Sequence, residues 1–299
     1  MIRVLAPGLF TTVQDLGRWG YQHQGVPVAG PMDLVSHCRA NRAVGNERGA
    51  ATLEITLGGP RLRFERAARF ALCGADCPMS LDGVPLAAGR THDAPAGAEL
   101  TIGRAAAGTR AYLAVAGGID VPPLLGSRST HVPSRMGGLD GRPLAAGDIL
   151  PIGRAAAGPP VETPAPPLPQ GGAALRVLEG PEAGQLDPEA WQTLVGSRFE
   201  LHRDSNRMGY RLVGPVVAAP EAPGFSTATT MGTVQLPAGG SPILLMADRP
   251  TTGGYPRVAH VITADLPIAG QLKPGDWVSF VPCTPEDARR ALDALAELL

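Results

Sequence analysis

A seven-residue pattern, Asp-x-x-Arg-x-Gly-Tyr, occurs twice in this chain, at residues 15–21 and again at 204–210. Two of the chain's four tyrosines lie inside it. A carboxylate, a guanidinium and a phenol around a glycine form a polar group, and charged side chains are seldom buried without partners. The repeat therefore indicates a functional polar site in each half of the chain. The alternative is a strand–turn–strand corner whose aspartate and arginine pair with each other, and both roles can coexist.

A second repeated pattern closes each half. Leu144-x-x-Gly147-Asp148 precedes one apolar run, and the same pattern recurs from Leu272 to Asp276. The distance from heptad to closing pattern is nearly twice as long in the first half as in the second. We infer two related β domains, the first enlarged by an insertion. Chance similarity of two β-turns is the competing explanation, since Gly-Asp is common turn chemistry.

Residues 155–174 are rich in proline and predict a semi-extended linker. The expected organisation is a first, enlarged β-barrel domain over 1–154, a second β-barrel domain over 175–283 and a C-terminal helix over 284–299. The other expected helices cover 31–44, with Asp33 near its start, and 187–196, capped by Asp187.

Composition favours a mainly β chain with short elements. The 299 residues include 39 glycines and 31 prolines, and only 18% are charged. Runs rich in β-branched or aromatic residues predict strands at 99–103, 110–116, 243–247, 258–263 and 277–281. The net charge of −1 argues against nucleic acid or an anionic membrane as the main partner. The chain has neither a signal-peptide pattern nor an apolar run of membrane-spanning length, so we expect a soluble cytoplasmic protein.

Several catalytic motifs are missing from the sequence. There is no G-x-x-x-x-G-K-[ST] phosphate loop, no H-E-x-x-H motif and no G-x-S-x-G elbow. The single lysine, Lys273, lies between Leu272 and Pro274, which is atypical of a biotin-carrying lysine. If biotin or ATP chemistry is involved, this chain therefore does not carry the biotin or a standard ATP cradle. The four cysteines have no clustered histidines, so we expect reduced thiols and no metal site.

The first candidate site combines the first heptad with the expected helix start. Asp15 and Asp33 are candidate catalytic carboxylates, and Arg18 and Tyr21 are candidate groups for binding an anionic substrate. Asp33 falls where unpaired helical N–H groups can hold an anion, although simple helix capping is the alternative.

A second candidate is the segment 127–130, in which Arg128 and Ser129 could clamp a carboxylate or phosphate. The alternative is an ordinary polar loop.

The third candidate is the loop over residues 246–256. An apolar run delivers Asp248 and Thr251, the other two candidate catalytic residues, to a loop whose glycines allow a ligand to approach the backbone. The candidate substrate-binding groups are Gly253 and Gly254, whose amides could line an oxyanion site, and Tyr255. A tight barrel corner is the alternative. Arg207 of the second heptad and Arg18 of the first are expected to face a shared cleft and to bind an anion bidentately.

Four segments carry a resemblance to a known family: VQDLGRWGYQHQGVPVAGPMD, YLAVAGGIDVPPLLGSRST, SNRMGYRLVGP and ILLMADRPTTGGYPRVAHVITADL. They resemble the KipA family, also called allophanate hydrolase subunit 2 or the C subunit of 5-oxoprolinase, which is related to the carboxyltransferase domain of urea carboxylase. The similarity runs from about Ile2 to Pro282. It implies two cyclophilin-like β-barrel domains with a few short helices.

The resemblance also implies a heteromeric enzyme. Its partners would be a KipI-like protein of the B type and a YcsF-like protein of the A type, and the complex would use ATP to open pyroglutamate to glutamate. One alternative is carboxyl transfer to urea or a related amide, with biotin carried by another chain. The other is a non-enzymatic, KipA-like regulator that binds a KipI-like partner. Asn206, Thr227 and Pro250 depart from the family's usual residues, which affects the expected substrate and not the fold.

Overall fold

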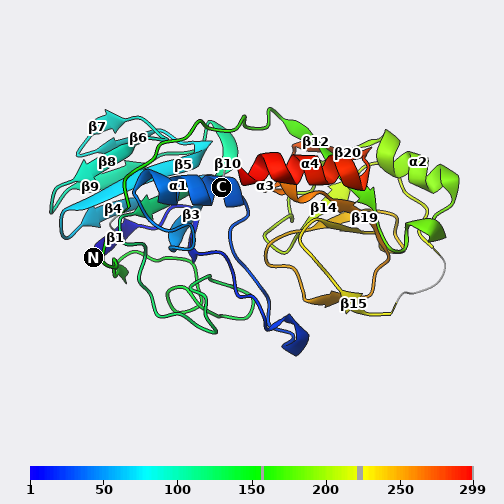
Figure 1. Cartoon of the computed structure of the whole chain (residues 1–299), viewed down its shortest axis with the longest axis horizontal. Coiled ribbons are helices and arrows are strands. Elements are labelled where there is room, and N and C mark those ends of the chain that lie inside the picture. The colour runs from blue at the N-terminus through cyan, green and yellow to red at the C-terminus, as the bar shows by residue number, and fades with distance from the viewer. Residues whose placement is uncertain (156–157, 221–224, 298–299) are drawn as a thin grey trace. The chain divides into compact units, whose positions relative to one another are not determined.

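The computed structural model describes residues 1–155, 158–220 and 225–297, and they form two compact units. The first unit comprises Met1–Trp19 and Ala29–Leu168, and the second comprises Gly20–Val28 and Pro169–Glu297 (Figure 1). Residues 156–157 of the expected linker lie outside the described residues. Its last three residues are not linker, because strand β12 begins at Gly172.

The first unit contains two antiparallel sheets around one core. The six-stranded sheet consists, in spatial order, of β11 (Ile149–Leu150), β1 (Ile2–Ala6), β4 (Arg61–Phe64), β9 (Glu99–Ile102), β6 (Met79–Leu81) and β7 (Val84–Leu86). The five-stranded sheet consists of β2 (Phe10–Gln14), β3 (Thr52–Thr56), β10 (Ala107–Val115), β5 (Ala68–Asp76) and β8 (Thr91–Ala94).

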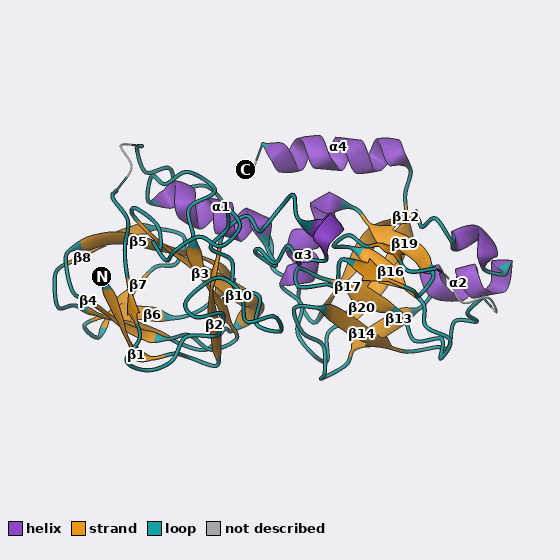
Figure 2. Ribbon diagram, turned by 90° about the horizontal axis from the view of Figure 1, so that it is seen from below, coloured by secondary structure: helices purple, strands orange, loops and turns teal. Residues whose placement is uncertain are grey.

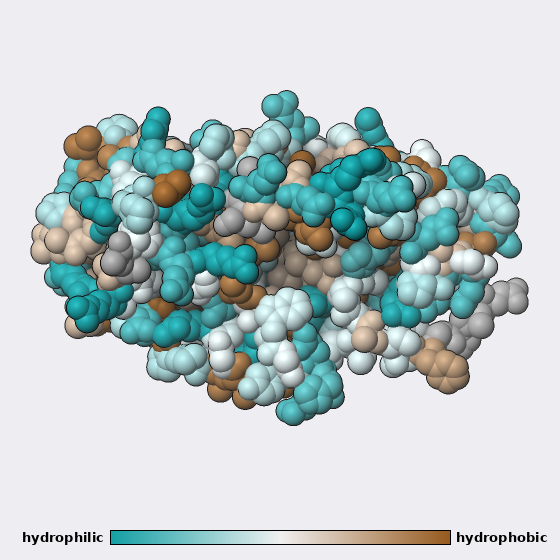
Figure 3. All heavy atoms as spheres, in the orientation of Figure 1, coloured by the Kyte–Doolittle hydropathy of each residue, from teal (hydrophilic) through white to brown (hydrophobic). Residues whose placement is uncertain are grey.

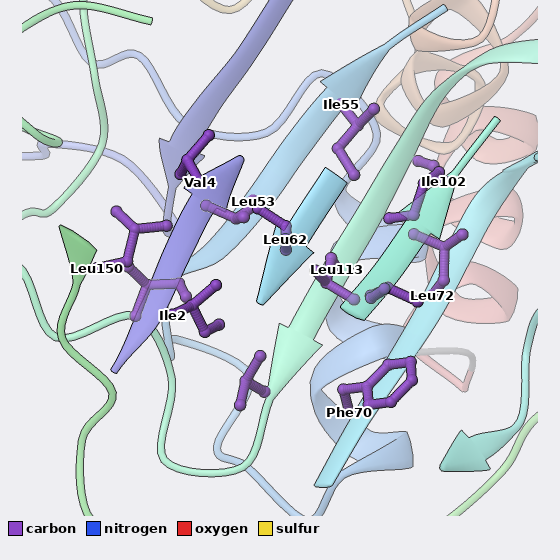
Figure 4. Packing of buried hydrophobic residues seen from close by; sticks show 14 of the residues in the cluster. Ile2, Val4, Leu53, Ile55, Leu62, Phe70, Leu72, Ile102, Leu113 and Leu150 are labelled. Carbon is purple, nitrogen blue, oxygen red and sulfur yellow. The ribbon is translucent and has the colours of Figure 1, made fainter. Parts of the chain in front are cut away.

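Both faces of β3, and so of the five-stranded sheet, are covered by other parts of the first unit. Leu53 and Ile55 point into the core, where Figure 4 shows them among apolar side chains of both sheets. Successive side chains of a strand point to opposite faces. Thr52 and Glu54 therefore lie on the other face, and they are buried as well. Helix α1 (Leu34–Ala43) lies over β5 and β10 of the same sheet.

The second unit is a closed seven-stranded barrel, which confirms the expected mainly β fold and the second of the two expected barrels, whereas the strands of the first unit form two separate sheets (Figure 2). Its buried interior includes Phe199, Tyr210, Val234 and Phe280. The strands follow the order β12 (Gly172–Glu179), β19 (Arg257–Val261), β16 (Thr233–Gln235), β17 (Ile243–Leu245), β14 (Gly209–Val213), β13 (Arg198–Leu201) and β20 (Trp277–Pro282).

Two further features complete the barrel. Strands β12 and β20 pair in parallel and close the ring, whereas the other barrel strands pair antiparallel. A short two-stranded sheet joins β15 (Thr227–Ala228) to β18 (Thr252–Gly253).

Of the three expected helices, α1 starts later than the sequence predicts. Helix α1 begins at Leu34, because Asp33 has extended backbone angles and is the cap itself. Asp187 precedes α2 (Pro188–Gly196), but its side chain makes no capping hydrogen bond. Helix α4 (Pro285–Ala296) has the expected capping box between Thr284 and Asp287. Residues 298–299 of that prediction lie outside the described residues. The remaining helical elements are α3 (Leu266–Gly270) and three 3₁₀ turns, η1 (Gln22–Gln24), η2 (Ala183–Gln185) and η3 (Thr263–Asp265).

The described surface is mixed in character. On the face drawn in Figure 3, hydrophobic side chains occur in small groups among hydrophilic ones. No helix in the described ranges is long and apolar enough to cross a membrane. No group of three or more potential metal ligands occurs among the described residues. Three of the cysteines are buried, and Cys283 is partly exposed.

Candidate functional site

The aspartate of the first heptad holds a loop in place. The Asp15 carboxylate accepts hydrogen bonds from Ser127 Oγ at 2.6 Å, Ser129 Oγ at 2.6 Å and the Arg128 backbone N–H at 2.5 Å. It also accepts one from the Gly17 N–H at 3.0 Å. A carboxylate with several donors is well stabilised in a buried position. Asp15 and Ser129 are both buried, so they anchor the loop and present no open site for a substrate.

The arginine of the first heptad supports the same loop. Arg18 is fully buried, and it donates from Nε to the Leu124 carbonyl at 2.9 Å and from Nη2 to the Ser129 carbonyl at 3.0 Å. Burial lowers its pKa, and the charge of Asp15 opposes that change. No ion pair joins Asp15 to Arg18 within the described ranges, so the alternative of mutual pairing is wrong for this heptad. Tyr21 directly precedes η1 in the segment Gly20–Val28, which groups with the second unit.

Arg128 is the part of this loop that reaches an open surface. Its Nη2 pairs with Asp120 at 2.6 Å, and its Nε donates to the Val121 carbonyl at 2.8 Å. The side chain borders a cavity of about 350 Å³ whose lining also includes Asn46, Glu47 and Arg154. Asp120 already pairs with the Arg128 guanidinium and neutralises part of its charge, so Arg128 would bind an anion only weakly.

Asp33 has the role of a helix cap. Its Oδ1 accepts from the Ser36 N–H at 3.0 Å, and its Oδ2 accepts from Ser36 Oγ at 2.5 Å. The Asp33 backbone N–H donates to Tyr112 Oη at 2.8 Å. Because the carboxylate is buried and caps α1, helix capping is the observed role of Asp33, and its expected catalytic role is not supported.

A buried polar network beneath α1 was not predicted from the sequence. Glu54 accepts from Tyr112 Oη at 2.8 Å and from the Met32 N–H at 2.9 Å, and the Nε of Arg110 lies 3.9 Å from its other oxygen. Burial is the main reason that the pKa of Tyr112 is raised. The phenol therefore stays protonated and donates its hydrogen to Glu54. A glutamate between two core-facing residues of TLEIT was the available signal for this network. The network binds α1 to the sheet.

His37 lies in the same buried layer and gives the first unit a predictable pH dependence. Its Nδ1 is 3.0 Å from Thr52 Oγ1, and its Nε2 is 3.0 Å from the Arg48 carbonyl. Burial lowers the pKa of His37 from 6.5 to about 4. The neutral imidazole therefore stabilises the fold fully above pH 6.5, and this contribution is lost as the pH falls toward 4.

We expect the replacement His37→Gln to reduce the acid sensitivity of the first unit. The wild-type free energy of unfolding should lose on the order of 2–3 kcal/mol through this group between neutral and mildly acidic pH. Thermal unfolding at stepped pH measures the effect, with exposed His23→Gln as the matched control. Equal pH slopes for wild type and His37→Gln would contradict the assignment.

The second unit contains a buried ion pair between two predicted site residues. Arg207 donates from Nε to Asp248 Oδ2 at 2.9 Å and from Nη2 to Oδ1 at 2.8 Å. The Asp248 backbone N–H also donates to the Arg207 carbonyl at 2.8 Å. In contrast, the aspartate of this heptad, Asp204, has a side chain that is 65% exposed. The arginine of each heptad is thus engaged inside its own unit and is not an open anion site.

The loop that follows Asp248 is held against the barrel. Thr229 donates from its backbone N–H to the Thr251 carbonyl at 3.0 Å, and its hydroxyl donates to the Pro250 carbonyl. Gly253 belongs to β18 and pairs with Thr227. A Cβ at Gly253 would lie 2.5 Å from Gln235 Nε2, so a larger residue here would displace the Gln235 amide.

The other predicted residues of this loop differ in accessibility. Thr251 is half-buried, Gly254 is exposed, and Tyr255 is 51% exposed. These three residues are the accessible members of the predicted site.

Two buried donors in this region were missed by sequence reasoning. Gln235 Nε2 and Arg249 Nε are both buried and have no hydrogen-bond partner within the part of the chain that the structure describes. Unpaired buried donors are uncommon in native proteins and call for an explanation. Arg249 directly follows Asp248, and Gln235 has the alternating position of an outward-facing strand residue. Neither signal separates a ligand-binding residue from an ordinary surface one.

The fold is mainly β, and its second unit combines a closed barrel with a loop that starts at the buried Arg207–Asp248 pair. The chain belongs to the family of the carboxyltransferase domain, subdomain A and B, whose model matches residues 24–282. It is 41% identical to the C subunit of 5-oxoprolinase from Escherichia coli (strain K12) over 292 residues, which cover 97% of this chain and 94% of that protein.

Larger proteins contain a similar region. Urea amidolyase of Lachancea kluyveri is 36% identical over 325 residues, covering 99% of this chain but 18% of that protein. The crystal structure of the Kluyveromyces lactis urea carboxylase matches with a TM-score of 0.93 and 34% identity, covering 100% of this chain and 29% of that one. The family expected from the sequence is confirmed.

Proposed function

We propose that this chain is the C-type subunit of a heteromeric, ATP-dependent 5-oxoprolinase that opens pyroglutamate to glutamate. The observation that carries the proposal is the similarity to the C subunit of the Escherichia coli 5-oxoprolinase, which extends over 94% of that protein. The urea amidolyase relative shares only 18% of its length with this chain. The match to nearly the whole of the C subunit favours the 5-oxoprolinase role.

The chemistry assigned to this chain is substrate binding and polarisation, not cofactor carriage. A biotin-bearing lysine needs an accessible side chain on an exposed turn. The Lys273 side chain is 41% exposed, but its ammonium lies 3.9 Å from Asp276, and its place between Leu272 and Pro274 is atypical of a biotin-carrying lysine. Lys273 therefore does not fit this role. ATP and any biotin would be held by the partner chains, a KipI-like B-type and a YcsF-like A-type protein.

The loop 248–255 is the proposed working part of this chain. The Arg207–Asp248 pair holds its first residue, and half-buried Thr251 and exposed Gly254 are accessible to a small amide. The amide of Gly254 would polarise a lactam carbonyl, and Thr251 would orient it. Asp248 would hold the loop in position, since its carboxylate is bound by Arg207.

The test is an ATPase assay of the assembled enzyme. We expect the chain, co-purified with its B-type and A-type partners, to hydrolyse ATP at least tenfold faster with 5-oxoproline than without it, because ring opening is coupled to ATP. Omission of this chain should abolish the stimulation and the release of glutamate. Stimulation that is equal with and without this chain would contradict the proposal.

Carboxyl transfer is the second candidate, and the match of the whole chain to urea carboxylase favours it. That reaction needs bicarbonate and a biotinylated partner, whereas 5-oxoproline opening needs neither. The same assay with urea, bicarbonate and a biotin carboxylase therefore separates the two. Bicarbonate-dependent ATP hydrolysis with urea and none with 5-oxoproline would favour carboxyl transfer.

A further inference from the structure

The outer face of β16 in the second unit is buried although it points away from the barrel interior. Val234 is fully buried and lies in the interior, so its neighbours Thr233 and Gln235 face outward. Both are nevertheless almost inaccessible, and Gln235 is only 4% exposed. The loop that contains β18 covers them, since the Gly253 backbone lies against the Gln235 amide.

Gln235 brings an unused donor to this covered face. Its Nε2 is buried and has no hydrogen-bond partner among the described residues. A buried amide nitrogen without a partner destabilises the fold. An apolar residue at this position would avoid that cost, so the amide is explained best by a ligand that accepts its hydrogen.

Arg249 brings an unused positive charge. It is 7% exposed, and its Nε is buried without a partner in the described part of the chain. The neighbouring carboxylate of Asp248 binds Arg207 through both oxygens. Burial lowers the pKa of Arg249, and Asp248 opposes this only in part. No ion pair of the described residues involves the Arg249 guanidinium, and a buried charge of this kind requires an anion.

The loop that carries Arg249 lies on the same face of the barrel as Gln235. Pro250, the residue after Arg249, accepts a hydrogen bond from the Thr229 hydroxyl, and Gly253 of the same loop lies against the Gln235 amide. His260 pairs with Thr233 across β16 and β19, and its Nδ1 is 3.5 Å from Thr233 Oγ1. Directly opposed residues of paired strands point to the same side, so His260, Thr233 and Gln235 share the outward face.

A cavity opens on this face, and the arginine that lines it is already compensated. The cavity measures about 300 Å³ and is lined by Thr230, Thr233, Arg257, His260 and three small apolar residues. Arg257 pairs with Glu182 through two bonds, at 2.9 and 2.6 Å. Of these two arginines, Arg249 is thus the one without a carboxylate partner among the described residues, and a small anion fits the sign of its charge.

We propose that Arg249 and Gln235 form a subsite for the carboxylate of a small amide substrate. The guanidinium binds one or both carboxylate oxygens, and the Gln235 amide donates a further hydrogen bond. The identification of that substrate as 5-oxoproline rests on the proposed function. The subsite itself belongs to this chain alone and does not depend on a partner protein.

The test uses titration calorimetry on the full chain with three probes. They are 5-oxoproline, 2-pyrrolidinone, which is the same lactam without the carboxylate, and inorganic phosphate. We expect 5-oxoproline to bind at least tenfold more tightly than 2-pyrrolidinone. Tighter binding of phosphate would assign the subsite to a phosphate group instead and would overturn the carboxylate assignment.

Variants separate binding from a structural role. We expect Arg249→Met and Gln235→Leu to weaken 5-oxoproline binding at least tenfold, while the melting temperature stays equal or rises, because each removes an unpaired buried polar group. Arg203→Met, at an exposed position of the same unit, is the control and should change neither quantity. A melting temperature that falls with unchanged affinity would show a structural role and overturn the proposal.

The two proposals fail in different ways. Absence of 5-oxoproline binding by the wild-type chain overturns the subsite, while 5-oxoproline-dependent ATP hydrolysis by the assembled enzyme can still succeed. Conversely, carboxylate binding that Arg249→Met abolishes supports the subsite even if the assembled enzyme shows no ATP hydrolysis with 5-oxoproline.

Discussion

The replacement Asp248→Ala is expected to lower the free energy of unfolding of the second unit by about 3–5 kcal/mol, a large part of a typical domain's stability. The change leaves the guanidinium of Arg207 in a buried position without the carboxylate that binds it through two oxygens. It also weakens the attachment of the loop that starts at residue 248. Urea unfolding followed by hydrogen exchange at the amides of β14 and β17 measures the loss.

The control is the double replacement Arg207→Met with Asp248→Leu, which removes both charges together. An apolar pair of similar volume can replace a buried ion pair at little cost, so most of the stability should return. A loss below about 1 kcal/mol for Asp248→Ala would show that solvent reaches Arg207 and compensates its charge.

The second large effect is expected for Asp15→Ala in the first unit. The replacement removes a buried acceptor of four hydrogen bonds and leaves the Ser127 and Ser129 hydroxyls and the Arg128 amide without their partner. We expect the unit to lose about 3 kcal/mol or more and the loop over residues 120–144 to become sensitive to protease. Limited proteolysis with mass spectrometry locates the cleavage, and thermal unfolding measures the loss.

The matched control lies at the same position of the other heptad. Asp204 has a side chain that is 65% exposed, so Asp204→Ala should change stability by no more than about 0.5 kcal/mol. If both aspartates gave equally small effects, the anchoring role of Asp15 would be wrong. Equal large effects would show that the two heptads are equivalent, against their different burial.

Local chemistry in the sequence was enough to predict much of the fold. Glycine and proline punctuation together with short β-branched runs predicted a mainly β chain, and the Thr284–Asp287 cap of α4 was correctly expected. The repeat of the heptad was less reliable as a guide to the site. It treated Asp15 and Asp204 as equivalent, whereas burial depends on the loop that packs against each one.

The sequence identified Arg207 and Asp248 as site residues but not as partners. They are 41 residues apart, and only the pairing of β14 with β17 brings them together. Glu54, Gln235 and Arg249 were missed for a related reason. Glu54 and Gln235 follow the pattern of solvent-facing strand residues, and each is buried because a helix or loop covers its strand. Arg249 lies in a loop and is buried as well. Tertiary cover of this kind has no local signature.

The parallel pairing of β12 with β20 has a consequence for how the second unit is made. The two strands that close the barrel are the first and the last of its strands to be synthesised. Until Trp277–Pro282 has left the ribosome, one edge of β12 has no partner, and the ring cannot close. At about 5–20 residues per second, this open state lasts on the order of ten seconds for each new molecule. An unpaired strand edge is a template for wrong pairing, so during synthesis this barrel depends on its last strand and on any chaperone that covers the edge before that strand arrives.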